Sequence, residues 1–280
     1  MARILLVIAL IAIVVVYLWR RRRAGATSAS TVSQTEAADA PPPLLPGSRA
    51  SLLEQHVRLW RRLPAPLQER LLPRLDEFLE RIPFTGAHDF QVTETMRTVI
   101  AAQACIVTLG HDDYPFDDLH GITVHPDEFV VEEADEDEDT GVVTEGYRTL
   151  SGQAHGSDRL VLSWRDVEEA QSREDGYNVV VHEVTHFLEH SHPGGDPAAH
   201  AALTAAYESL CAAVDRGEET LLDPYGAEDL TEFLAVAAEF FFERSADLAA
   251  RHPTLYVLLR DSFRLDPASW APTAVGKASS

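Results

Sequence analysis

Two histidines and a glutamate that could activate a water molecule stand close together in the second half of the chain. His182, Glu183 and His186 form the pattern H-E-x-x-H inside an apolar segment, which predicts a helix beginning near Asn178. Residues four apart share one face of a helix, so both imidazoles can bind the same metal ion. Glu183 would lie beside the open side of that ion and take a proton from a metal-activated water molecule. A set of two histidines, one carboxylate and a water molecule favours zinc over other metals.

A third protein ligand is needed, and the sequence offers several candidates. His190 continues the same helical face, but three turns of one straight helix cannot surround a single ion. His192 has the spacing of the third histidine in the metzincin pattern, which also requires a glycine where Glu189 stands and a methionine turn downstream. Glu232 and Glu239 are seven residues apart in a later apolar segment and face the same way. Each is either a ligand or a solvated surface residue.

The elements that must position these residues are mostly helices. Helical spacing of apolar residues predicts helices over residues 52–63, 67–82, 93–109, 197–215, 227–244 and 246–260. Residues 121–125 and 160–164 have the composition of strands. Between them, residues 132–139 form a dense acidic run that predicts a solvated, mobile loop. Helices with a few strands in the middle of the chain indicate an α+β fold with a small sheet.

The N-terminus predicts a single transmembrane helix. Residues 4–19 carry no charge, and four arginines follow at residues 20–23. The run is slightly shorter than the about 20 residues of a typical span, but the flanking arginines and aromatic residues suit the interface. A cleaved signal peptide is the alternative, although the arginines separate the apolar run from the cleavage-like Ala24-Gly25-Ala26. The arginines after the span predict an inner-membrane protein with its body in the cytoplasm.

Composition limits the classes of function. The 45 acidic and 23 basic residues give a formal net charge of −22, which argues against a nucleic-acid partner. Two cysteines cannot make a disulfide framework or a cysteine-rich zinc module. The sequence therefore predicts an anchor over residues 1–23, a flexible Pro/Ala/Ser-rich linker over 24–51, one folded domain over 52–267 and a disordered tail over 268–280.

Five segments of the body carry a family likeness: MRTVIAAQACIVTLG, LVLSWRDV, DGYNVVVHEVTHFLE, LDPYGAEDLTEFLAVAAEFFFE and RHPTLYVLLRDSFRLDP. Together they resemble the Mlc titration factor A (MtfA) family of zinc-dependent peptidases, over about residues 52–267. The resemblance implies a mostly helical, zincin-like α+β domain that holds one zinc ion per chain through His182, His186 and Glu232. It also implies that Glu183 is the catalytic base and that Tyr225 supports the transition state.

Some features depart from the family pattern. Glu189 stands where the family usually has an aspartate. The chain also adds an anchor and an acidic run, so we do not carry over the glucose-responsive repressor that some family members bind.

Two functions follow as hypotheses. The first is a membrane-tethered zinc peptidase that acts on a peptide or protein substrate, with residues 160–164 as the strand that edges the cleft and pairs with an extended peptide. The alternative is a regulatory protein of zincin fold that binds and sequesters a partner such as a transcription regulator. The intact set of His182, Glu183, His186, Glu232 and Tyr225 favours the enzyme.

Overall fold

The computed structural model describes residues 46–113, 115–127, 129–136, 143–150, 152–155, 158–191 and 196–270. The predicted anchor over residues 1–23 lies outside this part of the chain, as do residues 24–45 of the predicted linker and residues 271–280 of the predicted tail. Within the described residues, every helix is too short or too polar to cross a membrane.

A four-stranded sheet supports the helices of the body. Its strands, in spatial order, are β1 (Phe84–Gly86), β2 (Gly121–His125), β6 (Arg159–Ser163) and β5 (Gly152–His155). The first three strands are parallel, and β5 runs antiparallel to β6 at the edge. Ile122 pairs with Leu160 and Val124 with Leu162, and all four side chains are buried. Their alternation along each strand gives the sheet an apolar face for helices to cover.

The place of β6 in the sheet corrects one prediction. Residues 160–164 were expected to edge the cleft, but β6 pairs with β2 on one side and with β5 on the other. Its backbone N–H and C=O groups are therefore already bonded and cannot accept a peptide. The last strand on that side of the described sheet is β5. Trp164 begins helix α6 (Trp164–Ala170), because Ser163 Oγ accepts the Asp166 N–H at 3.3 Å and caps it.

A second correction concerns the acidic run. Residues 132–136, predicted as loop, belong to strand β3 (Phe129–Glu136), whereas residues 137–139 lie outside the described part of the chain. Strand β3 pairs antiparallel with β4 (Val143–Leu150) in a separate two-stranded sheet. The hydrogen bonds between β3 and β4 join backbone groups and do not depend on side-chain charge. The acidic charge pattern therefore did not reveal the strand.

The other described elements are helices. They are α2 (Pro46–His56), α3 (Arg58–Arg62), α4 (Ala65–Arg81), α5 (Glu94–Val107), α7 (Val179–Ser191), α8 (Pro197–Asp215), α9 (Leu230–Glu243), α10 (Ser245–Arg251) and α11 (Pro253–Phe263), with short 3-10 turns η1 (Ala87–Asp89), η2 (Pro224–Ala227) and η3 (Pro267–Ser269). The predicted mostly helical α+β class is confirmed. Both cysteines, Cys105 and Cys211, are free thiols.

The ends of the folded body lie further out than predicted. Helix α2 begins at Pro46, inside the predicted linker, and Trp270 is buried beyond the predicted end of the domain. The predicted helix over residues 246–260 is divided into α10 and α11, because Pro253 disfavours helical backbone at the preceding residue. His252 accordingly has φ −130° and ψ 60°.

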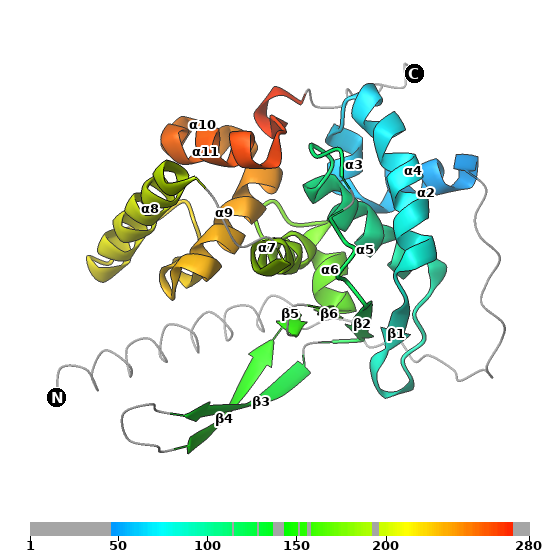
Figure 1. The fold of residues 1–280 in the computed structure, drawn as a ribbon, viewed down its shortest axis with the longest axis horizontal. Helices are drawn as coiled ribbons and strands as arrows, with labels where there is room; N and C mark the ends of the chain where they lie inside the picture. The colour runs from blue at the N-terminus through cyan, green and yellow to red at the C-terminus, as the bar shows by residue number, and fades with distance from the viewer. Residues whose placement is uncertain are drawn as a thin grey trace, which may run out of the picture. The chain divides into compact units, whose positions relative to one another are not determined.

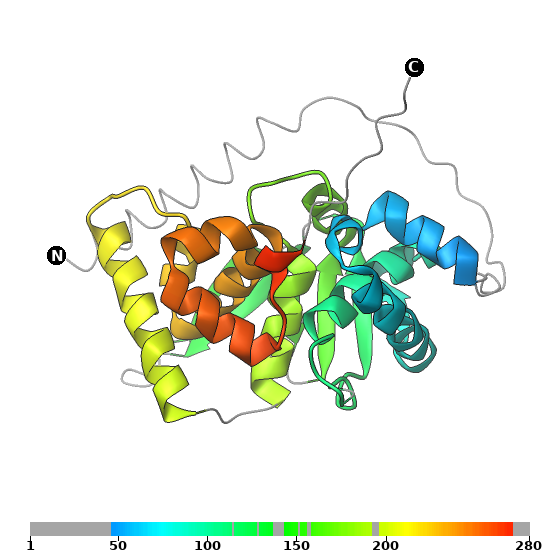
Figure 2. The ribbon, with the colours of Figure 1, turned by 90° about the horizontal axis from the view of Figure 1, so that it is seen from above.

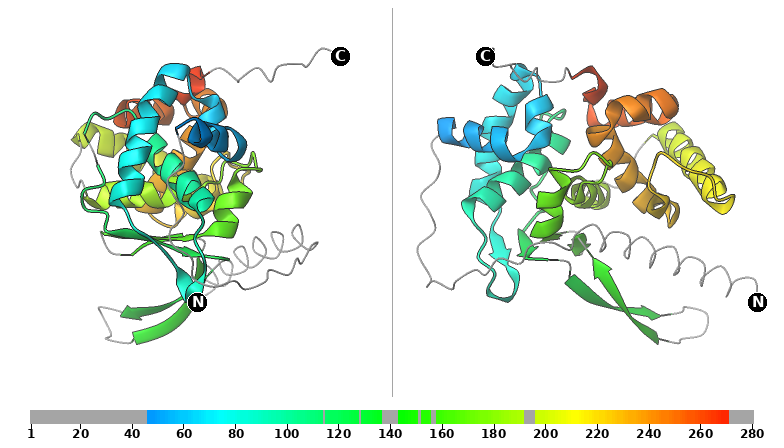
Figure 3. Two further views of the ribbon diagram at one scale, coloured as in Figure 1. Left: turned by 90° about the vertical axis from the view of Figure 1, so that its right-hand side faces the viewer. Right: turned by 180° about the vertical axis from the view of Figure 1, so that it is seen from behind.

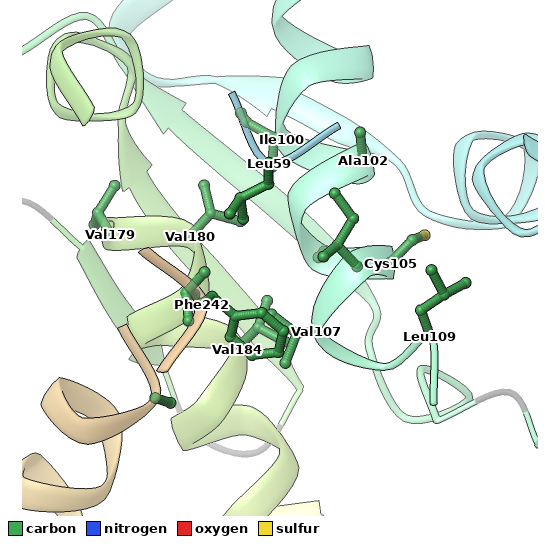
Figure 4. Close-up of a cluster of buried hydrophobic side chains, with 14 of the residues drawn as sticks. Leu59, Ile100, Ala102, Cys105, Val107, Leu109, Val179, Val180, Val184 and Phe242 are labelled. Carbon is green, nitrogen blue, oxygen red and sulfur yellow. The ribbon is translucent and has the colours of Figure 1, made fainter. Parts of the chain in front are cut away.

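Helix α7 is packed between two other helices and the sheet. It contacts α5 on one side, α9 on the other, and strands β5 and β6 of the sheet (Figures 1 and 2). The views of Figure 3 show the described helices gathered on one side of this sheet. Val180 and Val184 of α7 belong with Ile100 and Phe242 to one fully buried cluster (Figure 4). Burying such a side chain contributes about 1.5–3 kcal/mol, so packing holds α7 in place.

Candidate metal centre

Helix α7 presents two histidines on one face. It begins where the sequence predicted, because Asn178 Oδ1 accepts the N–H groups of Val180 and Val181 at 3.1 and 3.2 Å. One turn further on, the rings of His182 and His186 lie 4.7 Å apart between centroids. Their Nε2 atoms are 3.0 Å apart. The two nitrogen atoms therefore converge on one point, as a shared metal ion requires.

Helix α9 brings a carboxylate to the same point. Glu232 Oε2 lies 3.1 Å from His182 Nε2 and 3.5 Å from His186 Nε2. A tetrahedral ion about 2.0–2.2 Å from each ligand separates the ligand atoms by about 3.4 Å, close to the observed values. Among the described residues, these three form the group of ligand-type side chains that could hold a metal ion. Two imidazoles and one carboxylate match the donor set of catalytic zinc sites.

A buried phenylalanine follows a candidate ligand on each of the two helices. Phe187, next to His186, is 1% exposed and stacks on Phe116 at 6.0 Å between ring centroids. Phe233, next to Glu232, is fully buried. Successive residues point about 100° apart around a helix, so each phenylalanine packs into the core while its neighbour faces the cleft. Core packing thus fixes the rotation of both helices that carry ligands.

The second ring nitrogen of His182 has its own partner. Glu239 is 4% exposed, and its Oε1 lies 2.8 Å from His182 Nδ1. With Nε2 bound to a metal ion, Nδ1 would carry the ring proton and donate a hydrogen bond to the Glu239 carboxylate. The two glutamates on the same face of α9 therefore meet opposite nitrogens of one ring. This arrangement favours Glu232 as the third ligand. Glu239 contacts the other nitrogen and can orient the His182 ring.

The charges at the centre favour a cation. Burial acts to lower the pKa of His182, but the hydrogen bonds to Glu232 and Glu239 outweigh it and raise that pKa well above its ordinary value. Burial acts to raise the pKa of Glu232, yet its contacts with His182 and His186 hold the pKa far below the usual range. Carboxylates that stabilise a buried proton in this way also stabilise a metal cation in its place.

Glu183 combines deep burial with an unused acceptor atom. The residue is 4% exposed, and its Oε2 has no hydrogen-bond partner among the described residues. Burial raises the pKa of Glu183 to about 7, although the neighbouring His182 and His186 act in the opposite direction. A buried acceptor without a partner is costly in a folded protein, so it is typically reserved for a bound molecule. Glu183 can therefore receive a proton from water held at the centre.

The centre opens into a large cleft. Its volume is about 2060 Å³, and His182, Glu183, His186, Tyr225 and Glu232 all line it. Small-molecule pockets span about 300–1,000 Å³, so this cleft has room for a longer ligand. The Tyr225 ring lies 6.1 Å from the His182 ring between centroids. Its position is set by turn η2, where the Asp223 carboxylate accepts the Tyr225 N–H at 2.9 Å.

The remaining sequence candidates lie elsewhere. His190 and Glu189 are exposed and line the same cleft, but neither belongs to the group of possible ligands. His192 lies outside the described residues. Sequence reasoning did not anticipate the contact between Glu239 and His182. The spacing of seven residues was a usable signal, since it places a second carboxylate on the same face of α9.

Comparison with known proteins shows which family the chain belongs to. An uncharacterized protein of Synechocystis sp. is 30% identical over 240 residues, covering 80% of this chain and 86% of its own length. Mlc titration factor A of Pectobacterium atrosepticum is 30% identical over 222 residues, covering 73% and 83%. Mlc titration factor A of Serratia proteamaculans is 31% identical over 213 residues, covering 71% and 80%. The resemblance inferred from the five segments is thereby confirmed. Since the family model of the glucose-regulated metallo-peptidases M90 matches residues 31–264, the chain belongs to that family.

Proposed function

We propose that this chain is a zinc-dependent peptidase. One observation carries the proposal: the ligand atoms of His182, His186 and Glu232 converge in a cleft beside the unpartnered carboxylate oxygen of Glu183. A bound zinc ion would supply Lewis acidity, which polarises a water molecule and the carbonyl of the peptide bond. Membership of a metallo-peptidase family supports this assignment.

The side chains around the proposed zinc position have separate roles. Glu183 accepts the proton of the attacking water and returns it to the leaving amine, because it lies next to the ligand His182, is buried, and has an Oε2 atom without a hydrogen-bond partner among the described residues. Glu239 holds the His182 ring through Nδ1. Tyr225 lies beside the ligands and donates a hydrogen bond to the oxyanion that forms as water attacks.

Peptide cleavage by the purified full-length chain is the direct test. The chain is incubated with a peptide library in the presence of zinc, and the products are identified by mass spectrometry. We expect cleavage that a chelator stops and that added zinc restores. A chain that binds zinc but leaves the whole library intact would contradict the proposal and favour a partner-binding role.

The Tyr225→Phe variant is expected to keep zinc and to lower turnover by roughly 10²–10³-fold, the range for loss of one oxyanion donor. Removing the hydroxyl leaves the ring packed beside His182, so the ligands should not move. The measurement is kcat with one peptide substrate, together with the zinc content of the same sample. Loss of zinc from the variant would show instead that the hydroxyl supports the metal site.

The charge of the cleft predicts a preference for cationic peptides. Its described lining contains no lysine or arginine but includes the acidic residues Asp113, Glu183, Glu189, Asp196, Asp229, Glu232 and Asp261. Such a surface attracts cations and can raise association rates by about 10–10³-fold, an effect that salt reduces. We expect kcat/KM at low salt to be at least about 10-fold higher for a lysine-containing peptide than for its glutamate counterpart. Equal values for the two peptides would contradict this prediction.

We also propose that residues 1–23 anchor the chain in the inner membrane, with the body in the cytoplasm. The apolar run and the arginines that follow it support this. The full-length chain should stay with the membrane fraction through a high-salt wash, and deletion of residues 1–23 should release it. A reporter fused after Ser280 that works only outside the cytoplasm should stay silent. A mature chain beginning near Thr27 would show that the segment is a cleaved signal.

A further inference from the structure

A buried polar network begins at His182 and runs away from the cleft. Glu239, which bonds to His182 Nδ1, also accepts the backbone N–H of Asn178. Asn178 is fully buried, as is Gln103 of α5, whose Oε1 accepts from Asn178 Nδ2 at 2.8 Å. Glu243, one turn beyond Glu239 on α9, accepts from the same Nδ2 at 2.6 Å. The network therefore joins α5, α7 and α9 behind the metal ligands.

Asn178 connects the three helices, and all hydrogen-bonding groups of its side chain have partners. Its backbone N–H goes to Glu239, and its side-chain amide donates to Gln103 and Glu243. Its side-chain oxygen accepts two N–H groups at the start of α7. An asparagine side chain offers two donor hydrogens and an oxygen with two lone pairs, so every one of these is engaged. A fully satisfied buried amide allows one arrangement, which fixes the start of α7 against α9.

The network ends on α3 at a part-buried ion pair. Arg58 Nη2 lies 2.5 Å from Glu243 Oε2, and the Glu243 side chain is 2% exposed. Glu239 and Glu243 are four residues apart on one helix face, where like charges repel, and the repulsion grows in a buried setting. Arg58 neutralises the outer carboxylate. On the same helix, Arg62 donates to the carbonyl oxygens of Phe242 and Glu243 at the end of α9. The charge of α3 thus stabilises the glutamate-bearing end of α9.

We propose that Arg58, Glu243 and Asn178 are positioning residues that hold Glu239 against His182, so that the contact between α3 and α9 sets the affinity of the centre for zinc. The inference rests on the proposed zinc site. It goes beyond that site because it assigns a role to residues that do not touch the cleft. Each step is a hydrogen bond or ion pair between buried or part-buried groups, so the chain of contacts from α3 to His182 is unbroken.

Zinc affinity in matched variants of the full-length chain tests this role. Arg58→Met removes the charge and keeps most of the side-chain volume, and Arg58→Lys restores the charge. Arg61→Met is the control, since Arg61 lies on the same helix and donates to the backbone carbonyl oxygens of Glu54 and Gln55. Zinc is titrated against a competing chelator, and the cobalt(II) absorption spectrum reports the geometry of the ligands. Thermal unfolding without metal reports the fold.

We expect Arg58→Met to weaken zinc binding by about 10–100-fold, the range for groups that support a ligand from outside, and to alter the cobalt spectrum. Arg58→Lys should recover part of this loss, and Arg61→Met should bind like the wild type. Equal zinc affinity of folded Arg58→Met and Arg61→Met overturns the inference. If Arg58→Met does not fold, Asn178→Ser decides, because the serine oxygen keeps the helix cap while the two amide N–H donors to Gln103 and Glu243 are lost. Wild-type zinc affinity in that variant overturns the inference too.

The same titration separates this inference from the proposed function. A wild-type chain that binds zinc, with Arg58→Met weakened, but that cleaves no peptide would refute the peptidase and leave the network established. A wild-type chain that binds no zinc would refute both.

Discussion

Peptide hydrolysis should fall by roughly 10²–10⁴-fold in the Glu183→Gln variant, the range for loss of a general base, while zinc stays bound. Glutamine has nearly the same shape as glutamate, but its amide cannot accept the proton of the attacking water. Glu183 is buried and its Oε2 has no partner among the described residues, so the exchange breaks no observed hydrogen bond of that atom. The fold should therefore survive.

The measurement is kcat/KM with one peptide, accompanied by zinc content and unfolding temperature. Glu208→Gln is the matched control, because Glu208 is an exposed glutamate on α8. It should behave like the wild type. A Glu183→Gln variant that retains zinc and cleaves at the wild-type rate would remove Glu183 from the mechanism. It would also leave the unpartnered oxygen without an explanation.

Zinc should be lost from Glu232→Ala under conditions in which the wild type holds about one ion per chain. His182→Ala and His186→Ala should have the same effect, because each change removes one of three converging ligand atoms. Glu239→Ala should retain a site weakened by about 10–100-fold, since Glu239 contacts the ring nitrogen that faces away from the ion. Metal content after dialysis, followed by chelator competition, ranks the variants.

The comparison of two glutamates on one helix is the decisive part of that experiment. They lie on the same helix and contact the same histidine, but they meet different nitrogens of the His182 ring. If Glu239→Ala strips the metal and Glu232→Ala spares it, the ligand set is wrong. Equal loss in both variants would mean that the orientation of His182 matters as much as a ligand.

Several features of the fold could be predicted because they depend on nearby residues. Helix α7 begins directly after Asn178, because the Asn178 side-chain oxygen accepts the N–H groups two and three residues further on. Helix α5 begins after Thr93 for the same reason, with Thr93 Oγ1 accepting the Met96 N–H at 3.2 Å. Helix α8 and strand β2 have the predicted bounds. Local patterns also explain why the two histidines share a face, since four residues make about one helical turn.

Other features depend on which elements pack together, and local patterns do not contain that information. The strand that edges the sheet is β5, because β6 finds partners on both sides. The acidic residues 132–136 form a strand because β4 lies beside them. The composition of both segments was read correctly, as apolar in one and acidic in the other. Their place in a sheet depends on backbone pairing with another segment of the chain, which composition does not reveal.

The candidate metal centre likewise combines features set by local spacing with features set by packing. By itself the sequence determined that His182 and His186 face one point with Glu183 beside them, because helical geometry repeats every 3.6 residues wherever the helix lies. It also placed Glu232 and Glu239 on one face of α9, about 10 Å apart along the axis. Spacing left open which of them could bind metal. Only the packing of α9 against α7 decided this, by inserting the His182 ring between the two carboxylates so that each meets a different nitrogen.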